Sequence, residues 1–442
     1  MSSTVRRIVA LLITAGLLLT ACAPDEPDEE AEPDDEIRLV VFGPSQFDTI
    51  PGNTPESIHQ DVHQFLTEGF QEEYPEVEEI VFDAQGEIAD GVARTTNTQL
   101  AGEQMDIIVC HPINVHTAFQ ETGTILPVDD LVPEVEDRLV DGAIETFTID
   151  DQVWGIPLAE VAVTSFFYNA SMFDDLGIEP PETYEDFRQI GPTISDAGVE
   201  PVAHQGRNPW MWPIYYMSTL QQTTAESANE KTESNLRGET KFTDDEDVLA
   251  LELIQRWVED DLMSRGSLDL DEEALKSMFV SEETATYFGA TWDLPDLRET
   301  VGFELGIFKY PEYEDLPGEP RAFGSLEHGL CVSETTEHRE YAEAFIEFAT
   351  RPENAEYVLQ QLEPVGTSHE VYEGADDPIS EKVRDEYLPP LLYLDWLWPR
   401  ELTDVIQREI QEVVGGKDPA AAAEAIQGQY DRMVEEGYEY ED

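Results

Sequence analysis

Short apolar runs alternate with amphipathic helical patterns in the first quarter of the chain. The apolar runs are Ile37–Phe42, Glu79–Phe82 and Asp106–Cys110. Between them, apolar residues recur at helical spacing from Thr54 to Phe70 and from Ile88 to Leu100. This order of strand, helix, strand, helix and strand predicts a parallel sheet built from βαβ units. In such a sheet a ligand binds beyond the carboxyl ends of the strands.

One stretch in the middle of the chain, Val153 to Phe173, contains a long apolar run. It opens with Trp154-Gly155-Ile156-Pro157, in which an aromatic residue stands beside turn-forming residues, and continues to Phe166-Phe167-Tyr168. A short helical pattern follows Asn169. We interpret the stretch as a buried strand that leaves one α/β unit and enters another. It therefore predicts the first crossing between two lobes.

The chain after this stretch again mixes helices and strands. Thr183 and Asp186 have the spacing of a capping box and predict a helix that ends near Ala197. An aromatic-rich loop, Gly206–Trp212, follows a short strand, whereas residues 223–243 are polar and predicted to be irregular. Further strands are predicted at residues 284–289, 303–308 and 323–332, and further helices at 245–260, 337–349, 401–414 and 419–437. The second unit is therefore also α/β.

The N-terminal residues have the features of an export signal. Two arginines precede an apolar run, Ile8–Leu19, that is too short to be a comfortable transmembrane helix. The run leads into Leu19-Thr20-Ala21-Cys22, which resembles the lipobox of bacterial lipoproteins. That resemblance implies a signal peptide over residues 1–22, acylation of Cys22, and an extracytoplasmic protein held on the cell membrane by its lipid. The alternative is a secretory signal in which the cysteine stands by chance.

Acidic residues dominate the charge of the chain. It has 97 Asp and Glu against 24 Lys and Arg, a net charge of −73. Residues 23–36, almost entirely Asp, Glu, Pro and Ala, are predicted to be a disordered tether. The remaining acids are spread over every segment, which favours adaptation to very salty surroundings over attraction of a cationic ligand. Nucleic-acid binding is excluded because no basic patch could neutralise phosphates.

Two cysteines remain after the lipobox. Cys110 and Cys331 each lie in an apolar, strand-like run. We interpret them as two buried free thiols rather than as a disulfide. The sequence contains no CxxC motif and no cluster of Cys and His that would indicate zinc, and no cofactor is predicted.

Five motifs in order along the chain resemble those of the family 1 extracellular solute-binding proteins, the carbohydrate-binding class that includes maltose-binding protein. The resemblance runs from about Ile37 to Met433. The first motif is similar to the family's "PDII" strand, with methionine in place of proline, and the second to its "YGIP…YN" crossing. The motifs are Met105-Asp106-Ile107-Ile108, Trp154-Gly155-Ile156-Pro157 with Phe167-Tyr168-Asn169, Pro180 to Phe187, Glu337 to Glu353, and Gly415 to Pro419.

This resemblance implies a two-lobe, type II periplasmic-binding-protein-like α/β fold, with a hinge and a ligand cleft between the lobes. It implies crossings near Asn169 and near Phe323. The first lobe would comprise residues 37–168 and 321–375, and the second residues 169–320 and 376–442. Cys110 and Cys331 would then belong to strands of the same lobe.

The aromatic residues of a sugar site cover the apolar C–H faces of the ligand. Trp210 and Trp292 lie in loops, and the family position favours a role in ligand stacking. Trp396 and Trp398 are further candidates, and we expect only one of the two to face the cleft. Trp257 lies on a helical stripe and is assigned to the core.

The polar residues of such a site pair with the hydroxyl groups of the sugar. One set of candidates lies at the ends of predicted strands or after a turn: Gln46, Asp83, His111 and Glu160. Asn208 and Asp293 are candidates because they neighbour the two loop tryptophans. Glu327, near the second crossing, is a weaker one. Arg207 and Arg321 could pair with an anionic sugar, so an acidic ligand remains an alternative.

These features together predict a monomeric lipoprotein that captures a sugar or oligosaccharide and delivers it to the permease subunits of an ABC importer. No catalytic step is needed for that role. The alternatives are a surface glycan-active hydrolase, a binding protein for a non-sugar solute, and an adhesin or scaffold without a small ligand. A glycosidase needs two carboxylates at a defined separation, and with so many acids a chance pair is uninformative. No nucleophile elbow, HExxH motif or P-loop is present.

Overall fold

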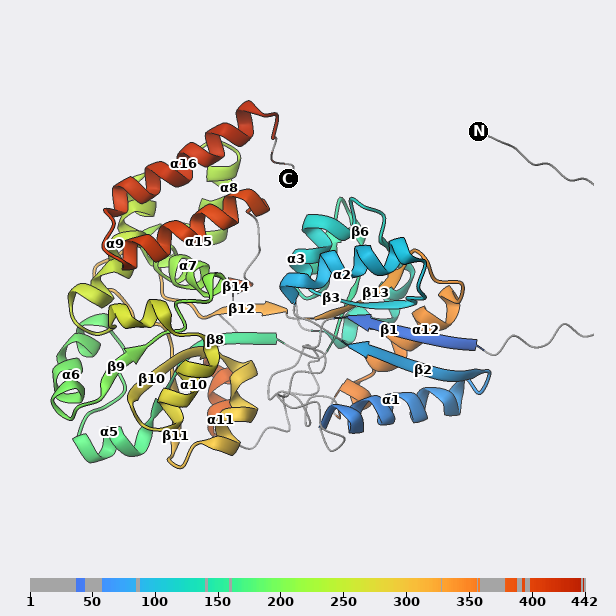
Figure 1. Cartoon of the computed structure of the whole chain (residues 1–442), viewed down its shortest axis with the longest axis horizontal. Coiled ribbons are helices and arrows are strands. Elements are labelled where there is room, and N and C mark those ends of the chain that lie inside the picture. The colour runs from blue at the N-terminus through green and yellow to red at the C-terminus, as the bar shows by residue number, and fades with distance from the viewer. Residues whose placement is uncertain are drawn as a thin grey trace, which may run out of the picture. The chain divides into compact units, whose positions relative to one another are not determined.

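The computed structural model contains two six-stranded sheets with helices around them (Figure 1). The predicted signal peptide, lipidation site and tether lie outside the described residues, as do Gln46, Glu160, Glu327 and Trp396. The structure describes residues 37–43, 58–84, 88–139, 142–158, 161–326, 328–355, 357, 378–387, 392–393, 398–438 and 440.

The first sheet contains the predicted βαβ units. Its strands run in the order β2-β1-β3-β13-β4, and β7 pairs with β13. β1 is parallel to β2 and to β3, as the sequence predicted, whereas β13 is antiparallel to β3. Helices α1 (Ile58–Glu73) and α2 (Ile88–Ala101) connect the first three strands. The strands are β1 (Ile37–Gly43), β2 (Val77–Ala84), β3 (Ile107–Cys110), β4 (Ile125–Leu126), β7 (Ile156–Pro157) and β13 (Gly329–Ser333).

Both faces of this sheet are covered because β1 is apolar on both sides. Leu39 and Val41 belong to the large hydrophobic core, and Val40 and Phe42 to a smaller one. On the first face, α1 packs against α12 (Arg339–Ala349), where the ring of Phe70 lies 5.3 Å from that of Phe345. Figure 1 shows α1 and α2 on opposite sides of the strands. A strand buried on both faces is typical of a parallel sheet.

The second sheet is organised around β8 (Val161–Asn169). Its order is β14-β12-β8-β10-β9, and β11 also pairs with β8. β8 is antiparallel to β10, β11 and β12, whereas β9 is parallel to β10. The other strands are β9 (Glu200–Ala203), β10 (Thr284–Ala290), β11 (Leu305–Phe308), β12 (Phe323–Leu326) and β14 (Leu392–Tyr393).

Helices surround this second sheet, and most begin at a recognisable cap. The predicted capping box of α6 is confirmed: Asp186 N donates to Thr183 Oγ1 at 3.0 Å and Thr183 N to Asp186 Oδ2 at 3.0 Å. The prediction that residues 223–243 are irregular is wrong, because a second capping box, Ser227 with Glu230, starts α8. The helices are α5 (Ala170–Leu176), α6 (Tyr184–Asp196), α7 (Trp212–Thr223), α8 (Ala228–Leu236), α9 (Asp245–Glu259), α10 (Glu272–Val280), α11 (Leu294–Thr300), α15 (Arg400–Val414) and α16 (Pro419–Glu435).

The chain changes sheets at two places that differ from the predicted crossings. β7 belongs to the first sheet and all of β8 to the second, so the first crossing lies before Val161 and not near Asn169. The return lies between Leu326 and Gly329, because β12 and β13 belong to different sheets. The predicted single strand at residues 323–332 is therefore two strands. A buried strand has the same apolar sequence pattern in either sheet, so the pattern does not indicate to which sheet the strand belongs. The assignment of whole segments to lobes stays a prediction.

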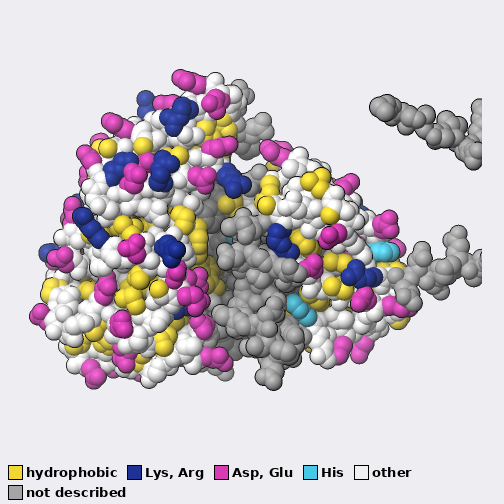
Figure 2. Space-filling view, in the orientation of Figure 1, with side chains coloured by type: hydrophobic (Ala, Val, Ile, Leu, Met, Phe, Trp, Pro, Cys, Tyr) yellow, Lys and Arg dark blue, Asp and Glu magenta, His cyan; other side chains and the backbone are white. Residues whose placement is uncertain are grey.

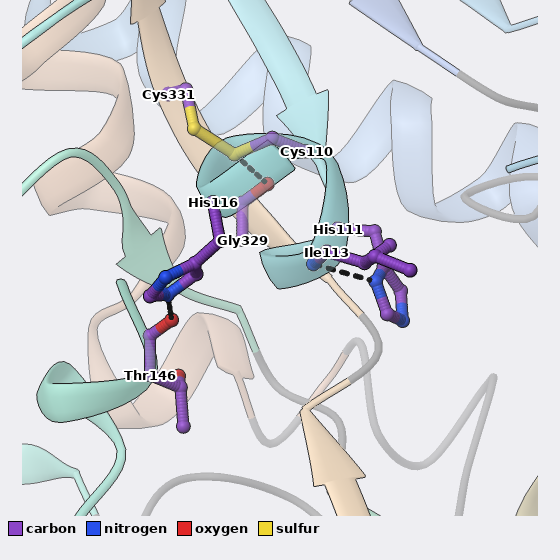
Figure 3. The surroundings of a disulfide bond; sticks show 7 residues. All are labelled: Cys110, His111, Ile113, His116, Thr146, Gly329 and Cys331. Atoms are coloured by element: carbon purple, nitrogen blue, oxygen red, sulfur yellow. Dashed lines mark hydrogen bonds between the residues drawn. A yellow bond between two sulfur atoms is a disulfide. The ribbon is translucent and has the colours of Figure 1, made fainter. Parts of the chain in front are cut away.

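Cys110 and Cys331 form a disulfide, so the interpretation as free thiols is wrong (Figure 3). Their Cα atoms are 6.2 Å apart on the neighbouring strands β3 and β13. Both residues are fully buried. The pairing depends on a contact between strands 221 residues apart, which no local pattern reveals.

The core of the second sheet centres on Phe166 of β8. Its ring is stacked on that of Phe308 at 5.1 Å and lies 4.6 Å from Phe288, its partners on the two neighbouring strands. Trp257 of α9, predicted to be a core residue, is fully buried and stacks on Phe166 at 5.7 Å. These contacts join three strands and a helix in one aromatic cluster.

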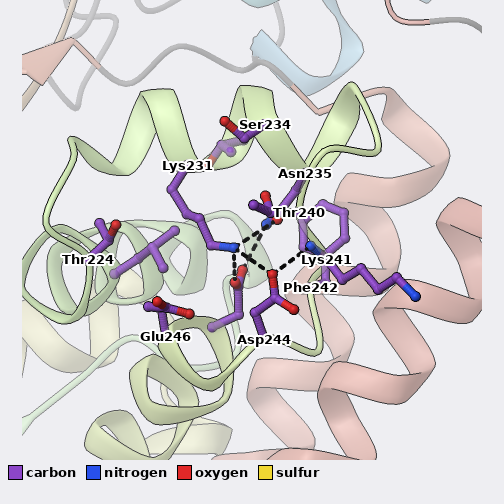
Figure 4. A network of polar contacts seen from close by, with 12 residues as sticks. Thr224, Lys231, Ser234, Asn235, Thr240, Lys241, Phe242, Asp244 and Glu246 are labelled. Carbon is purple, nitrogen blue, oxygen red and sulfur yellow. Dashed lines mark hydrogen bonds and ion pairs between the residues drawn. The ribbon is translucent and has the colours of Figure 1, made fainter.

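A buried ionic network joins α7, α8 and α9 (Figure 4). Lys231 Nζ lies 3.1 Å from Asp247 and 3.2 Å from Asp244, and its side chain is 3% exposed. Asp247 also accepts hydrogen bonds from Tyr216 at 2.6 Å and Asn235 at 2.9 Å. Burial raises the pKa of Asp247, and the ammonium group of Lys231 opposes that shift. Such a pair is tolerated because each charge has several partners.

Removal of the disulfide should destabilise the protein. The double variant Cys110→Ala, Cys331→Ala frees a loop of 221 residues in the unfolded chain. We expect its free energy of unfolding to be about 2–5 kcal/mol lower than that of the wild type. Urea unfolding in high salt measures this. Reductant should lower the stability of the wild type and leave that of the double variant unchanged; equal stabilities of the two proteins without reductant would contradict the prediction.

Truncation at the centre of the aromatic cluster should have a comparable effect. Phe166→Ala removes a fully buried ring and should lower the free energy of unfolding by about 3–5 kcal/mol. Leu100→Ala is the control, because Leu100 is 81% exposed on α2 and its loss should cost about 0.5 kcal/mol or less. Denaturant unfolding compares the two variants. A similar loss for both would show that Phe166 is not a central contact.

Candidate functional site

Both crossings leave the second sheet at the edge where β9 and β10 end. These two parallel strands end at Ala203 and Ala290. Because β8 is antiparallel to β10, its early residue Thr164 lies opposite Ala290. Leu326, the last residue of β12, pairs with Val161. The start of β8 and the end of β12 therefore lie at the carboxyl edge of β9 and β10.

Both crossings also join the first sheet at the edge where its parallel strands end. Gly329, the first residue of β13, lies opposite Cys110, the last residue of β3. It also lies opposite Pro157 of β7. The two crossings are themselves adjacent, since Leu158 N donates to His328 O at 3.0 Å. Short connections thus link the carboxyl edges of both sheets, which are the edges where ligands of α/β proteins bind.

Two of the predicted aromatic residues meet at the edge of the second sheet. Trp210 lies in a 3₁₀ turn (Pro209–Met211) beyond β9, and Trp292 in another (Thr291–Asp293) beyond β10. Their ring centroids are 5.9 Å apart with an angle of 56° between the planes. Both residues remain partly exposed. The parallel pairing of β9 and β10 brings together two turns that are more than 80 residues apart in sequence.

The predicted polar neighbours of these tryptophans are engaged within the protein. Asn208 Nδ2 donates to Gln205 Oε1 at 2.7 Å. Asp293 is fully buried, with Oδ1 3.1 Å from Lys276 Nζ and Oδ2 accepting from Ala290 N at 3.3 Å. Burial raises the pKa of Asp293 to about 6, and Lys276 opposes that shift. The carboxylate of Asp293 is thus directed toward Lys276.

Three further tryptophans of the described residues lie in or near the core. Trp398, predicted to be a candidate for stacking, is 5% exposed, and its ring lies 6.0 Å from that of Tyr216. Trp212, which the sequence placed in a loop, is the fully buried first residue of α7 and donates from Nε1 to Gly206 O at 3.0 Å. Trp154 is partly buried.

Two predicted polar residues lie near the carboxyl edge of the first sheet. His111 follows β3, is 4% exposed, and accepts at Nδ1 a hydrogen bond from Ile113 N at 3.2 Å (Figure 3). Its side chain thereby caps the short helix α3 (Pro112–Asn114). Asp83 of β2 is partly buried and lines an open hollow of about 450 Å³ beside Arg38 and Gln104.

The structure adds residues at these edges that the sequence reasoning missed. Arg94 of α2 donates from Nη1 to Gly43 O at the end of β1, at 3.1 Å, and its guanidinium lies 4.8 Å from the ring centroid of Phe42. His204 and Gln205 follow directly after β9 and are fully buried. The same rule that selected His111, a polar residue after a strand, would have selected these two.

His204 is held in an aromatic environment. Its ring lies 4.4 Å from that of Trp212 and 4.7 Å from that of Tyr215. Burial lowers the pKa of His204 to about 3 because no solvent stabilises an imidazolium there. The neutral ring therefore packs against the first turn of α7, which directly follows the turn that carries Trp210.

The described residues offer neither a metal-binding cluster nor a helix suited to span a membrane. No group of three or more His, Cys, Asp and Glu among them is placed to hold a metal ion. Within the same residues no helix has both the length and the apolar character to cross a membrane.

Comparison with protein families gives a clear result. The sequence model of one family, described as bacterial extracellular solute-binding protein, matches residues 66–384, more than half of the chain. The chain belongs to this family. The predicted recognition as a family 1 carbohydrate-type solute-binding protein is confirmed, and the family consists of binding proteins and not of enzymes.

Two curated relatives match part of the chain. A multiple sugar-binding protein of Streptococcus mutans is 24% identical over 258 residues, 57% of this chain and 60% of the relative. An arabinooligosaccharide-binding protein of Halalkalibacterium halodurans is 23% identical over 280 residues, 61% of this chain and 59% of the relative. The chain thus aligns with about 60% of the length of these relatives.

Solved structures with the same fold match most of the chain. A chitin oligosaccharide binding protein has a TM-score of 0.74 at 18% identity, covering 90% of this chain and 99% of its own. A maltose-bound T. maritima protein, MalE3, has a TM-score of 0.69 at 16% identity, covering 90% and 100%. The predicted two-lobe, type II α/β fold is confirmed by this likeness.

The buried His204 should make stability depend on pH. Its pKa in the folded state is lowered, so the unfolded chain binds the proton more readily below pH about 6.5. Stability is fully present above that pH and is lost as the pH falls toward 3. His204→Phe should not show this loss. Below pH about 6.5, the unfolding free energy of the variant minus that of the wild type should therefore rise by about 1.4 kcal/mol for each pH unit of acidification.

Urea unfolding of both proteins at several pH values between about 7.5 and 4.5 measures that difference. In roughly this window His204 titrates in the unfolded chain but not in the folded protein. Leu100→Ala serves as control, because its difference from the wild type should not vary with pH. A constant difference for His204→Phe as well would show that the ring is not held neutral.

Proposed function

We propose that this protein captures a sugar or oligosaccharide between its two lobes and delivers it to an ABC importer from an extracytoplasmic, lipid-anchored position. The observation that carries this proposal is the pair formed by Trp210 and Trp292 at the carboxyl edge of the second sheet. Both crossings start from that same edge. The tryptophans that would contact the ligand therefore lie at the same sheet edge as the two crossings, about which the lobes would move.

The chemistry of the aromatic pair suits a carbohydrate. Sugar rings have apolar C–H faces that pack on flat indole rings, and their hydroxyl groups need polar partners at the rim. Trp210 and Trp292 remain partly exposed, so each has ring surface to offer. Polar groups lie at the edge of the first sheet, where Arg94 reaches the end of β1 and His111 follows β3. Relatives named for sugar binding support this ligand class.

Capture would follow from closure of the lobes about the two crossings. A ligand that contacts both carboxyl edges binds the closed form more tightly and shifts the population toward it. Release requires the importer to favour the open form. The chain need supply no chemical step in this cycle.

The charge of the protein favours an uncharged sugar over an acidic one. The net charge is −73, and Figure 2 shows acidic side chains scattered over the described parts of the visible face. Arg207, a candidate partner for an anionic sugar, is 3.4 Å from Asp271 and thus already has a carboxylate beside it. We also propose that the dispersed acids are an adaptation to high salt, in which counter-ions screen their repulsion.

A screen of sugars by thermal shift tests the proposed function. Maltose, raffinose and oligosaccharides of chitin, xylan and arabinan are added to the purified protein in high salt. A sugar that binds the folded state alone raises the melting temperature, and the rise grows with the logarithm of its concentration relative to Kd. We expect at least one neutral oligosaccharide to do so. A shift by peptides or polyamines and by no sugar would overturn the sugar assignment.

Substitution of the aromatic pair refines this test. Trp210→Ala and Trp292→Ala should each abolish or strongly reduce the shift by the sugar found in the screen. Tyr341→Ala on α12 is the control, because it truncates a partly exposed aromatic residue of the first-sheet region. New reducing ends in the same samples would instead favour the glycan hydrolase.

A further inference from the structure

The turn that carries Trp292 is built around a buried carboxylate. Asp293 follows Trp292 in the same 3₁₀ turn, and its Oδ2 accepts from Ala290 N at 3.3 Å, which closes the turn on itself. Gly289 stands where a Cβ atom would overlap Asp293 Oδ2 and the ring of Tyr287. The last residues of β10 therefore leave room for this carboxylate and for little else.

A lysine from another helix neutralises this carboxylate. Lys276 of α10 places Nζ 3.1 Å from Asp293 Oδ1, 2.9 Å from Glu272 Oε1 and 3.7 Å from Asp296 Oδ2. Its side chain is 15% exposed, and that of Asp293 is fully buried. The charged and titratable groups around Asp293 are thus Lys276 and Glu272 of α10, Asp296 of α11, and the phenol of Tyr287.

The same turn is also tied to the first crossing. Thr291, the first residue of the turn, accepts at Oγ1 a hydrogen bond from Val163 N near the start of β8, at 3.0 Å. This turn of three residues therefore makes three contacts. Asp293 pairs with Lys276, and Thr291 binds β8 close to the first crossing. Trp292 lies beside Trp210.

We propose that Lys276 and Asp293 are positioning residues for the ligand site: their buried ion pair fixes the turn at residues 291–293, so that the ring of Trp292 is held beside Trp210. Without the lysine, the carboxylate is an uncompensated charge in a buried position, and the turn opens to hydrate it. The placement of the ring stands independently of the ligand, whereas its effect on affinity rests on the proposed function.

This proposal corrects the role predicted for Asp293 from sequence. A carboxylate beside a loop tryptophan was expected to bind a sugar hydroxyl. The structure directs it away from solvent, to Lys276 and to the backbone N–H of Ala290, so it acts on the ligand through the neighbouring ring. Because Lys276 precedes Asp293 by 17 residues and lies on α10, no local pattern associates it with the site.

Near-ultraviolet circular dichroism tests the placement of the ring without any ligand. The contribution of Trp292 is the wild-type spectrum minus that of Trp292→Phe, and the same subtraction is made in each variant background. We expect this contribution to be lost in Lys276→Met and retained in Lys276→Arg, which keeps the charge. Lys417→Met is the matched control, because Lys417 also pairs with a buried carboxylate, Glu409, but far from this turn along the chain.

Loss of the signal in Lys276→Met alone supports the proposal. Retention of the signal in Lys276→Met, or an equal loss in Lys417→Met, overturns it. Should Lys276→Met fail to fold, the wild type supplies a second test. Its Trp292 contribution should change with a midpoint near pH 6 as Asp293 takes up its proton and the pair loses its attraction, and no such midpoint should appear in Asp293→Asn.

Affinity for the sugar identified by the thermal-shift screen is the functional measurement. Lys276→Met should weaken binding by about tenfold or more, equivalent to about 1.4 kcal/mol, while Lys276→Arg and Lys417→Met should stay within about threefold of the wild type. If no sugar binds the wild type, the proposed function fails, but the spectroscopic result still decides whether the ion pair positions the ring. Unchanged affinity in Lys276→Met overturns the link to binding.

Discussion

The second half of the structure depends on the burial of β8 on both faces and along both edges. Phe166 faces the aromatic cluster and Phe167 the opposite core, while β10 occupies one edge and β11 and β12 the other. A strand so enclosed cannot shift by one residue without exchanging its two apolar faces and breaking three ladders of hydrogen bonds. Its start is therefore fixed, and with it the position of the first crossing.

The disulfide likewise fixes the part of the first sheet where the two crossings join it. It joins the last residue of β3 to β13, and Gly329 at the start of β13 pairs with both β3 and β7. The ends of both crossings are thus held on a covalently closed pair of strands, next to His111. Two rigid sheets joined by short segments at their ligand-binding edges form an arrangement suited to closure about a ligand.

Some of the few lysines of this acidic chain form buried ion pairs, a structural role that the net charge does not indicate. Of six lysines, Lys231 and Lys276 are largely buried, each beside a buried aspartate. Solvent ions screen these two pairs much less than surface pairs, so more of their attraction persists in concentrated salt. One pair belongs to a network that joins the helices α7, α8 and α9, and the other lies at the turn of the candidate site.

The sequence alone determined the features that arise from neighbouring residues. Periodicity and caps predicted the βαβ units, the α6 capping box and the core position of Trp257, and the ordered motifs predicted the family and the fold. Loop placement and the family resemblance also selected Trp210 and Trp292 as candidates. Only the tertiary structure decided that Cys110 pairs with Cys331, that β8 belongs to the second sheet, and that Asp293 is bound by Lys276. Each of these depends on contacts between distant segments, whose pairing is set by packing of the whole chain and not by local pattern.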